Sequence, residues 1–196
     1  MSYAEELNQA AEEYGLNRGG EYFKIKDGDN KVRVLSHGVP IATHKFGQKF
    51  ITCYGQDNGC QFPHDRQKGF SVKFMFYVID RADGKVKLAR FPYTVAKYIA
   101  DLQADDDWSF EDFPMPYDFN LKAKGAGTLE VEYTFAPSPK RVELTAEEAE
   151  AIANLDPVDE IVNKMKEKSR KENNDPNYNP NVGTAFDDQP LEENEQ

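Results

Sequence analysis

Hydrophobic and polar residues alternate along several short stretches of this 196-residue chain, and turn-forming residues separate the stretches. Alternation with a period of two is typical of β-strands that are buried on one face. Turns rich in Asp, Asn, Ala and Gly join these stretches in pairs, which predicts three antiparallel hairpins. The predicted strands cover residues 22–26, 31–35, 72–80, 85–91, 117–123 and 129–135.

Helical patterns lie between and outside these hairpins. The predicted helices cover residues 2–14, 94–102, 145–155 and 158–171, with Ser2, Thr94 and Thr145 as candidate caps and Pro157 opening the last helix. Short antiparallel strands with one inserted helix predict a mainly β fold, an OB-like five-stranded antiparallel barrel. The predicted segments are an N-terminal helix (1–19), the barrel (20–144), two C-terminal helices (145–171) and a disordered acidic tail (172–196).

Alternation also assigns side chains to the two faces of the predicted barrel. Phe74, Phe76 and Val78 point inward, whereas Lys73 and Tyr77 point outward. Lysines and arginines occupy the outward positions of the neighbouring strands as well. One face of the barrel is therefore expected to be cationic, with Tyr22 and Tyr77 among its positive charges.

The charge is distributed unevenly along the chain. Its net charge is −11, but residues 21–100 contain 14 Lys and Arg against seven Asp and Glu. Lysines that follow phosphates and aromatic rings that stack on bases are what single-stranded nucleic acid requires. A solvated face without a ligand is the alternative interpretation. The candidate DNA-binding residues are Tyr22, Lys24, Lys26, Lys31, Arg33, Lys45, Phe46, Lys49, Phe50, Tyr54, Lys73, Tyr77, Lys85 and Lys87.

Both cysteines and two of the three histidines lie in the long connection between residues 37 and 69. The order is His44, Cys53, Cys60 and His64, a spacing of H-x8-C-x6-C-x3-H. Four nitrogen and sulfur ligands suit a tetrahedral Zn²⁺, which would order a long loop in a reducing compartment. The alternative is that the cysteines are ordinary small residues and the histidines lie at the surface.

The run Phe74–Arg81, followed by Gly84–Leu88 and preceded by Cys53-Tyr54-Gly55 and Gly59-Cys60, resembles the single-stranded DNA-binding proteins of tailed bacteriophages. The resemblance covers about residues 20–136. It implies an OB-type barrel, a zinc held by His and Cys in some members, and a role in coating single strands during replication and recombination. This chain has His64 where a third cysteine would be expected.

The last 25 residues contain seven acidic and no basic residues. The resemblance implies that such a tail competes with DNA for the basic groove and recruits replication or recombination proteins, with Phe186, Asp187 and Asp188 as the anchor. Self-association on DNA is a further expectation. A tail that serves solubility alone is the alternative.

Other classes of protein are weighed against this interpretation. A metal-dependent nuclease could use Asp105, Asp106 and Asp107, but no histidine or lysine is placed for catalysis, so we expect no enzyme. A protein-only adaptor would not need a cationic face. The chain has no apolar run long enough to span a bilayer and no secretory signal pattern, which predicts a cytoplasmic protein, within the bacterial host if a phage encodes it.

Overall fold

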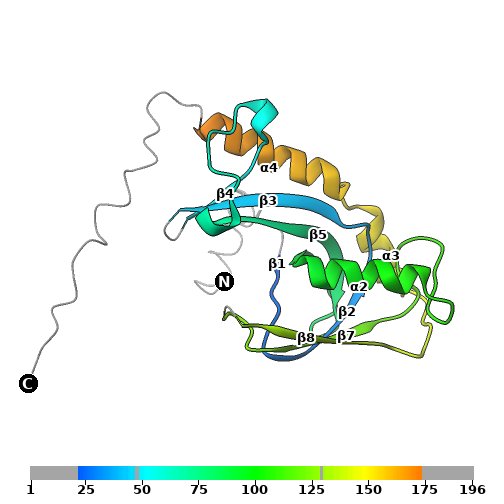
Figure 1. Cartoon of the computed structure of the whole chain (residues 1–196). Coiled ribbons are helices and arrows are strands. Elements are labelled where there is room, and N and C mark those ends of the chain that lie inside the picture. The colour runs from blue at the N-terminus through cyan, green and yellow to red at the C-terminus, as the bar shows by residue number, and fades with distance from the viewer. Residues whose placement is uncertain (1–21, 47–48, 129, 174–196) are drawn as a thin grey trace, which may run out of the picture. The chain divides into compact units, whose positions relative to one another are not determined.

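The computed structural model describes residues 22–46, 49–128 and 130–173, and Figure 1 shows the fold. The strands are β1 (Tyr22–Phe23), β2 (Gly28–Val34), β3 (Val39–Phe46), β4 (Lys49–Thr52), β5 (Phe70–Asp80), β6 (Lys85–Phe91), β7 (Phe119–Lys124) and β8 (Glu132–Pro137). The helices are α2 (Tyr93–Ala104), α3 (Ala146–Ala153) and α4 (Val158–Asn173), with 3-10 turns η1 (Gln56–Asn58) and η2 (Arg66–Lys68). The chain divides into two compact units: unit 1 comprises residues 1–40 and 73–158, and unit 2 comprises residues 41–72 and 159–196.

Unit 1 is built on a mixed sheet in the order β1-β6-β5-β2-β7-β8. β1 is parallel to β6, and the other neighbours in this order are antiparallel. Within the described ranges no pairing joins the two ends of this order, so the sheet is open. The predicted mainly β class, the helix between the second and third hairpins and both of those hairpins are confirmed. A closed barrel is not observed.

The core of unit 1 lies between one face of this sheet and α2. Phe76 and Val78 on β5 point into it, as their alternation predicts, and meet Ile99 on α2. Val32 and Phe119 from neighbouring strands are fully buried in the same cluster. Burial of large apolar side chains from both layers fixes the helix on the sheet.

The opposite face of the β5–β6 hairpin is also covered, which corrects the predicted cationic face there. Glu148 on α3 forms an ion pair with Arg81 at the end of β5, and α3 contacts β6. Tyr77 on this face, expected to point to solvent, is only 9% exposed. α3 covers this face, so the polar side that the alternation in β5 predicted is not exposed to solvent.

Lys87 on β6 was also expected to point to solvent and is also 9% exposed. It lies directly opposite Val78 and shares the face of Val78, where Asp80 and Asp83 pair with it.

Arg33 on β2 is a further correction to the predicted cationic face. Its side chain is 1% exposed, and its Nε donates to Asp118 at 2.9 Å. Its Nη1 donates to the carbonyl of Val142 at 2.7 Å. This charge is therefore neutralised inside unit 1, since a buried guanidinium requires such partners.

The first predicted hairpin is wrong. Within the described part of the chain, β1 pairs with β6, and β2 pairs with β5 and β7. The side chain of Asn30, read as a turn residue, is buried and donates to the carbonyls of Lys26, Gly28 and Leu121. These bonds hold residues 26–30 against β7, so the Asp-Gly-Asp-Asn run begins a strand instead of reversing the chain.

The predicted C-terminal helices are confirmed. Thr145 and Glu148 form the predicted capping box, and α4 begins directly after Pro157. α2 begins at Tyr93, and no side chain among the described residues caps its first turn, so the predicted Thr94 cap is wrong. The predicted N-terminal helix, residues 174–196 of the predicted tail and its anchor Phe186 lie outside the described residues. Residues 172 and 173, which the prediction placed in the tail, belong to α4.

The connection between residues 37 and 69, read as a long loop, contains regular structure. β3 and β4 form an antiparallel hairpin, η1 and η2 follow it, and α4 belongs to the same unit. In the described part of the chain, no helix is long and apolar enough to cross a membrane.

Candidate metal centre and nucleic-acid interface

The four predicted metal ligands come together in unit 2. His44 lies on β3, Cys53 follows β4, Cys60 follows η1, and His64 precedes η2. One ligand atom from each residue lies within 4.8 Å of all the others. Among the described residues, this is the one group of three or more His, Cys, Asp and Glu side chains that converge in this way.

The separations between the ligand atoms fit a tetrahedral zinc site. Bonds of about 2.3 Å to sulfur and 2.0–2.1 Å to nitrogen place two sulfur ligands about 3.8 Å apart and a sulfur and a nitrogen about 3.6 Å apart. The Sγ atoms of Cys53 and Cys60 are 3.9 Å apart. His64 Nε2 lies 3.1 Å from Cys53 Sγ, and His44 Nε2 lies 3.4 Å from Cys60 Sγ. The residues therefore fit the metal in both number and spacing.

Neighbouring backbone groups orient the ligands. The Nδ1 of His44 lies 3.1 Å from the carbonyl oxygen of Pro63. A carbonyl only accepts, so Nδ1 holds the proton and Nε2 is left with its lone pair toward the cysteines. The backbone N–H of Gly55 donates to Cys53 Sγ at 3.4 Å. The sequence gives no signal for either contact, because both depend on how the loop folds back.

Two glycines shape the turn that brings the cysteines together. Gly55 and Gly59 flank η1 with φ of 90° and 83°, the left-handed region that other residues rarely enter. The N–H of Cys60 donates to the carbonyl of Gly55 at 3.0 Å and closes this turn. The six residues between Cys53 and Cys60 therefore form one compact turn, which depends on the positive φ angles of two glycines.

Burial shifts the pKa of two of the ligands, Cys53 and His44. It raises the pKa of the Cys53 thiol, against the opposing effects of the Gly55 N–H and the charge of Lys166. Burial also lowers the pKa of His44. A bound Zn²⁺ would instead favour the thiolates, and two thiolates with two neutral imidazoles balance its charge. Four protein ligands leave no open position, which is typical of a structural site.

Aromatic rings enclose the ligands. Phe62 and Phe70 each lie 5.3 Å from the His44 ring, measured between centroids. Tyr54, proposed as a DNA contact, is 4% exposed and packs with the two cysteines. Its predicted position at a binding surface is therefore wrong, because the chain turns inward immediately after Cys53.

α4 supports this cluster through contacts that the sequence did not predict. The hydroxyl of Ser169 donates to the carbonyl of Thr52 at 2.6 Å, one residue before Cys53. Asn173 at the end of α4 donates in turn to the Ser169 carbonyl at 2.6 Å. A serine in a run of charged residues has no periodic signature that would indicate such a bond.

The β3–β4 hairpin presents predicted DNA-binding residues to solvent. Lys45 lies directly opposite Phe50, and Phe46 lies opposite Lys49. Directly opposed residues share one face of an antiparallel pair, so Lys45 and Phe50 lie on the face opposite to that of His44. Phe50 is 65% exposed, and Lys45 and Lys49 are also exposed. Lys49 lies on the other face, with Phe46. We call Lys45 and Phe50 the hairpin patch.

Candidate residues of unit 1 that remain at its surface are more scattered. Tyr22 is 37% exposed and lies 5.0 Å from the guanidinium of Arg90, measured to the ring centroid. Lys31 is exposed but lies 3.6 Å from Asp118. The other exposed lysines of this group are Lys24, Lys26, Lys73 and Lys85.

The acidic run does not form a metal site within the described residues. The Asp105 carboxylate accepts from the backbone N–H groups of Asp107 and Trp108, at 2.9 and 3.2 Å. Asp106 and Asp107 are exposed. This run therefore shapes the turn that follows α2.

Comparisons with protein-family models, with curated proteins and with solved structures give no match to this chain.

Proposed function

We propose that this protein binds single-stranded DNA with little dependence on sequence, through a zinc-held unit that presents the β3–β4 hairpin. The observation that carries the proposal is the hairpin patch. An exposed phenylalanine lies directly opposite a lysine, Lys45, on a hairpin whose His44 belongs to the Cys/His cluster. A large apolar ring at 65% exposure is costly in water, and base stacking would remove that cost.

Zinc supports this arrangement by ordering the hairpin. His44 on β3 and Cys53 just beyond β4 belong to the two strands of the hairpin, so one ion would hold both strands. Cys60 and His64 would bind the same ion and so hold the turns that follow β4. Lys45 and Phe50 would then approach a DNA strand with less loss of conformational entropy.

The strand order in unit 1 supports an OB-like fold. In an OB barrel the first strand pairs with the second and the fourth, the second pairs with the third, and a helix follows the third. Taking β2, β5, β6, β7 and β8 as these five strands, the corresponding pairs β2–β5, β2–β7, β5–β6 and β7–β8 are present, with α2 after β6. We propose a partly open version, in which β1 lies parallel to β6 at the edge where closure would occur.

The role in phage replication and recombination, with partners recruited through Phe186, Asp187 and Asp188, remains part of this proposal. The net charge of −11 does not oppose it, since a strand meets the local field within about one Debye length, roughly 10 Å. A protein-only adaptor and a nuclease are the competing functions.

Fluorescence anisotropy with labelled oligo-dT, duplex DNA and RNA of equal length tests the proposal. We expect the full chain to prefer single strands, and its affinity to fall with salt by a log–log slope of about −0.7 for each neutralised phosphate. Equal affinity for the duplex, or no binding of oligo-dT at low salt, would overturn it. Cleavage of the oligonucleotide in the presence of Mg²⁺ would favour the nuclease.

A further inference from the structure

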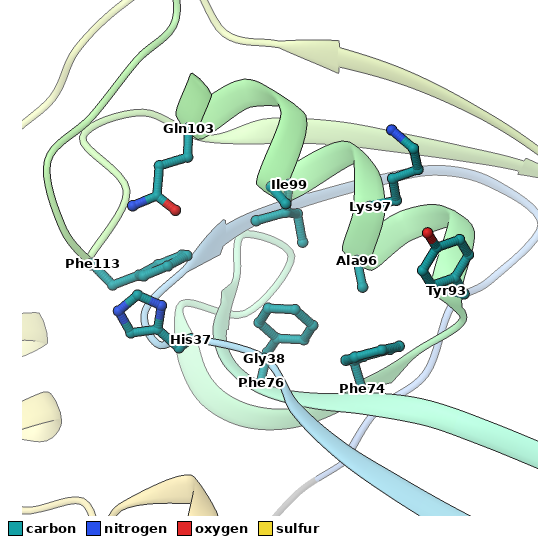
Figure 2. A pocket seen from close by; sticks show the side chains of 11 residues that line it. His37, Gly38, Phe74, Phe76, Tyr93, Ala96, Lys97, Ile99, Gln103 and Phe113 are labelled. Atoms are coloured by element: carbon teal, nitrogen blue, oxygen red, sulfur yellow. The ribbon is translucent and has the colours of Figure 1, made fainter. Parts of the chain in front are cut away.

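Unit 1 contains a cavity of about 290 Å³ against α2, apart from the surfaces considered above. Figure 2 shows aromatic rings around it, with Tyr93 near one end and Phe113 near the other. Phe74 and Phe76 of β5 form the side opposite α2. Cavities that bind drug-sized ligands have volumes of about 300–1,000 Å³, so this one suits a single ring system.

A glycine allows the cavity to form. A Cβ added to Gly38 would lie 2.3 Å from Cζ of Phe76, a distance that atoms cannot adopt. The backbone therefore passes close to the Phe76 ring only because position 38 lacks a side chain. On either side of this point, His37 lies edge-on to Phe113 at 4.6 Å, and Phe74 lies 6.2 Å from Tyr93.

The polar groups of the cavity suit the edge of a flat, neutral ring. Gln103 lines the wall and offers an amide, whose nitrogen also donates to the carbonyl of Glu111 at 3.4 Å. An amide can match the donor and acceptor of a base edge, as Gln does with adenine. His37 and Lys97 also line the cavity, but each is paired with a carboxylate, that of Asp112 or Asp101. Because both groups already contact a carboxylate, the lining favours an uncharged ring over a phosphate.

Tyr93 indicates how such a ring would enter. Its side chain is 64% exposed although it lines an aromatic cavity. Exposed apolar surface that is continuous with a groove often marks a ligand-binding site. Figure 2 shows the Tyr93 ring beside the floor formed by Phe74. A second ring seated there would stack between aromatic walls, as bases do in the pockets of enzymes that extrude them.

We propose that this cavity receives one nucleobase of a bound single strand. The inference rests on the proposed function and adds to it a second stacking site, in unit 1, that the sequence analysis did not assign. Stacking of one base changes affinity by about five- to 150-fold when the aromatic partner is removed. The site would take any base by its face, and Gln103 would add a preference at the base edge.

The test uses the full chain and an oligo-dT in which 5-iodouracil replaces thymine, with mass spectrometry of the photo-cross-linked peptides. We expect a cross-link to an aromatic residue of the cavity. Tyr93→Ala, and Ala96→Leu, which fills the cavity, should each weaken oligo-dT binding by about five- to 150-fold. Thr94→Ala, an exposed residue of the same helix that does not line the cavity, is the matched control.

The outcomes separate this inference from the proposed function. If the wild-type protein fails to bind oligo-dT, the proposed function itself is wrong. If it binds but the cross-links all lie outside the cavity, and Tyr93→Ala and Ala96→Leu behave like Thr94→Ala, only the base site is overturned. Tyr93→Ala keeps the test valid should Ala96→Leu fail to fold, because the Tyr93 side chain is mostly in solvent. If a peptide of residues 174–196 binds the protein, and Ala96→Leu is the only variant that abolishes this binding, the cavity belongs to the tail. That result would also overturn the base site.

Discussion

The sulfur atoms of Cys53 and Cys60 lie 3.9 Å apart, almost twice the length of a disulfide bond. A nitrogen of His64 lies 3.1 Å from the first sulfur, and one of His44 lies 3.4 Å from the second. Two buried thiols and two imidazoles at these separations are compatible with a tetrahedral zinc site. The spacing along the sequence is irregular, and the folded geometry is what brings the four atoms together.

The first prediction concerns metal content. Protein purified without chelator should contain one zinc per chain by elemental analysis. Cys53→Ser and Cys60→Ser should each lose most of it, because a serine hydroxyl is a poor replacement for a thiolate. His37→Ala is the matched control, since the third histidine of the chain contacts Asp112 and Phe113 and is not part of the cluster.

Zinc should also contribute to folding stability. An ion that binds only the folded state adds its binding free energy to that of folding, so a chelator should lower the melting temperature of the wild type. His37→Ala should respond to the chelator as the wild type does. A wild-type protein without metal, with the same melting temperature in either buffer, would exclude the site.

The second prediction follows from Lys87, which the sequence placed on the binding face. Its Nζ donates to Asp80 at 2.8 Å and to Asp83 at 2.5 Å, and it is 9% exposed. Lys87→Ala should lower the free energy of unfolding by about 1.5–3 kcal/mol, because it removes charged hydrogen bonds and leaves the buried Asp80 without its cation. Urea denaturation measures this change.

The same variant separates structure from binding. We expect Lys87→Ala to leave the salt dependence of oligo-dT binding unchanged, because Lys87 is not available to phosphates. Lys85→Ala, at an exposed position on the same strand, is the control and should have little effect on stability. A smaller salt slope in Lys87→Ala, with normal stability, would show that the buried assignment is wrong.

Strand alternation predicted one side of unit 1 correctly and the other incorrectly. Phe76 and Val78 lie in the core as expected. Tyr77 is buried because α3, some 70 residues further along the chain, covers its face. Lys87, expected on the face of Tyr77, lies opposite Val78 on the core face and is paired with Asp80 and Asp83. Period-two patterns show which side chains share a face, but they do not show which faces receive a second layer.

The metal cluster could be predicted from the sequence, whereas the aromatic cavity could not. Cys and His residues are rare in this chain, so four of them within 21 positions were a usable signal. Phe74 lies on β5, Tyr93 on α2 and Phe113 in the connection between α2 and β7, and the chain has many other aromatic residues. Asn30 shows a different limit, because its run of turn residues is typical of a hairpin, yet its side-chain hydrogen bond to Leu121, 91 residues away, ties it to β7.

The third prediction is an acid-dependent loss of stability through Glu148. Burial by itself would raise the pKa of this carboxyl, but hydrogen bonds from Arg81 and from the Thr145 backbone outweigh it and hold the pKa below its ordinary value of 4.5. A lowered folded-state pKa stabilises the protein above the unfolded value and loses this effect as the pH falls through the folded value. Stability should therefore decline from about pH 5 downward.

Thermal denaturation across this acidic range measures the effect. Glu148→Gln should be less stable than the wild type near neutral pH, and the difference should narrow as the pH falls. Glu147→Gln, an exposed neighbour on the same helix, should keep the wild-type pH dependence. A constant difference between wild type and Glu148→Gln at every pH would mean that the ion pair with Arg81 does not contribute.

Phe50 gives the most direct test of strand binding by the hairpin patch. The measurement is the affinity of the full chain for labelled oligo-dT, by fluorescence anisotropy at several salt concentrations, for the wild type and Phe50→Ala. We predict that the wild type binds and that Phe50→Ala is weaker by about 1–3 kcal/mol with the same salt slope, because stacking is lost while the lysines remain. Equal affinities, or a wild type that does not bind oligo-dT at low salt, would contradict single-strand binding by this hairpin.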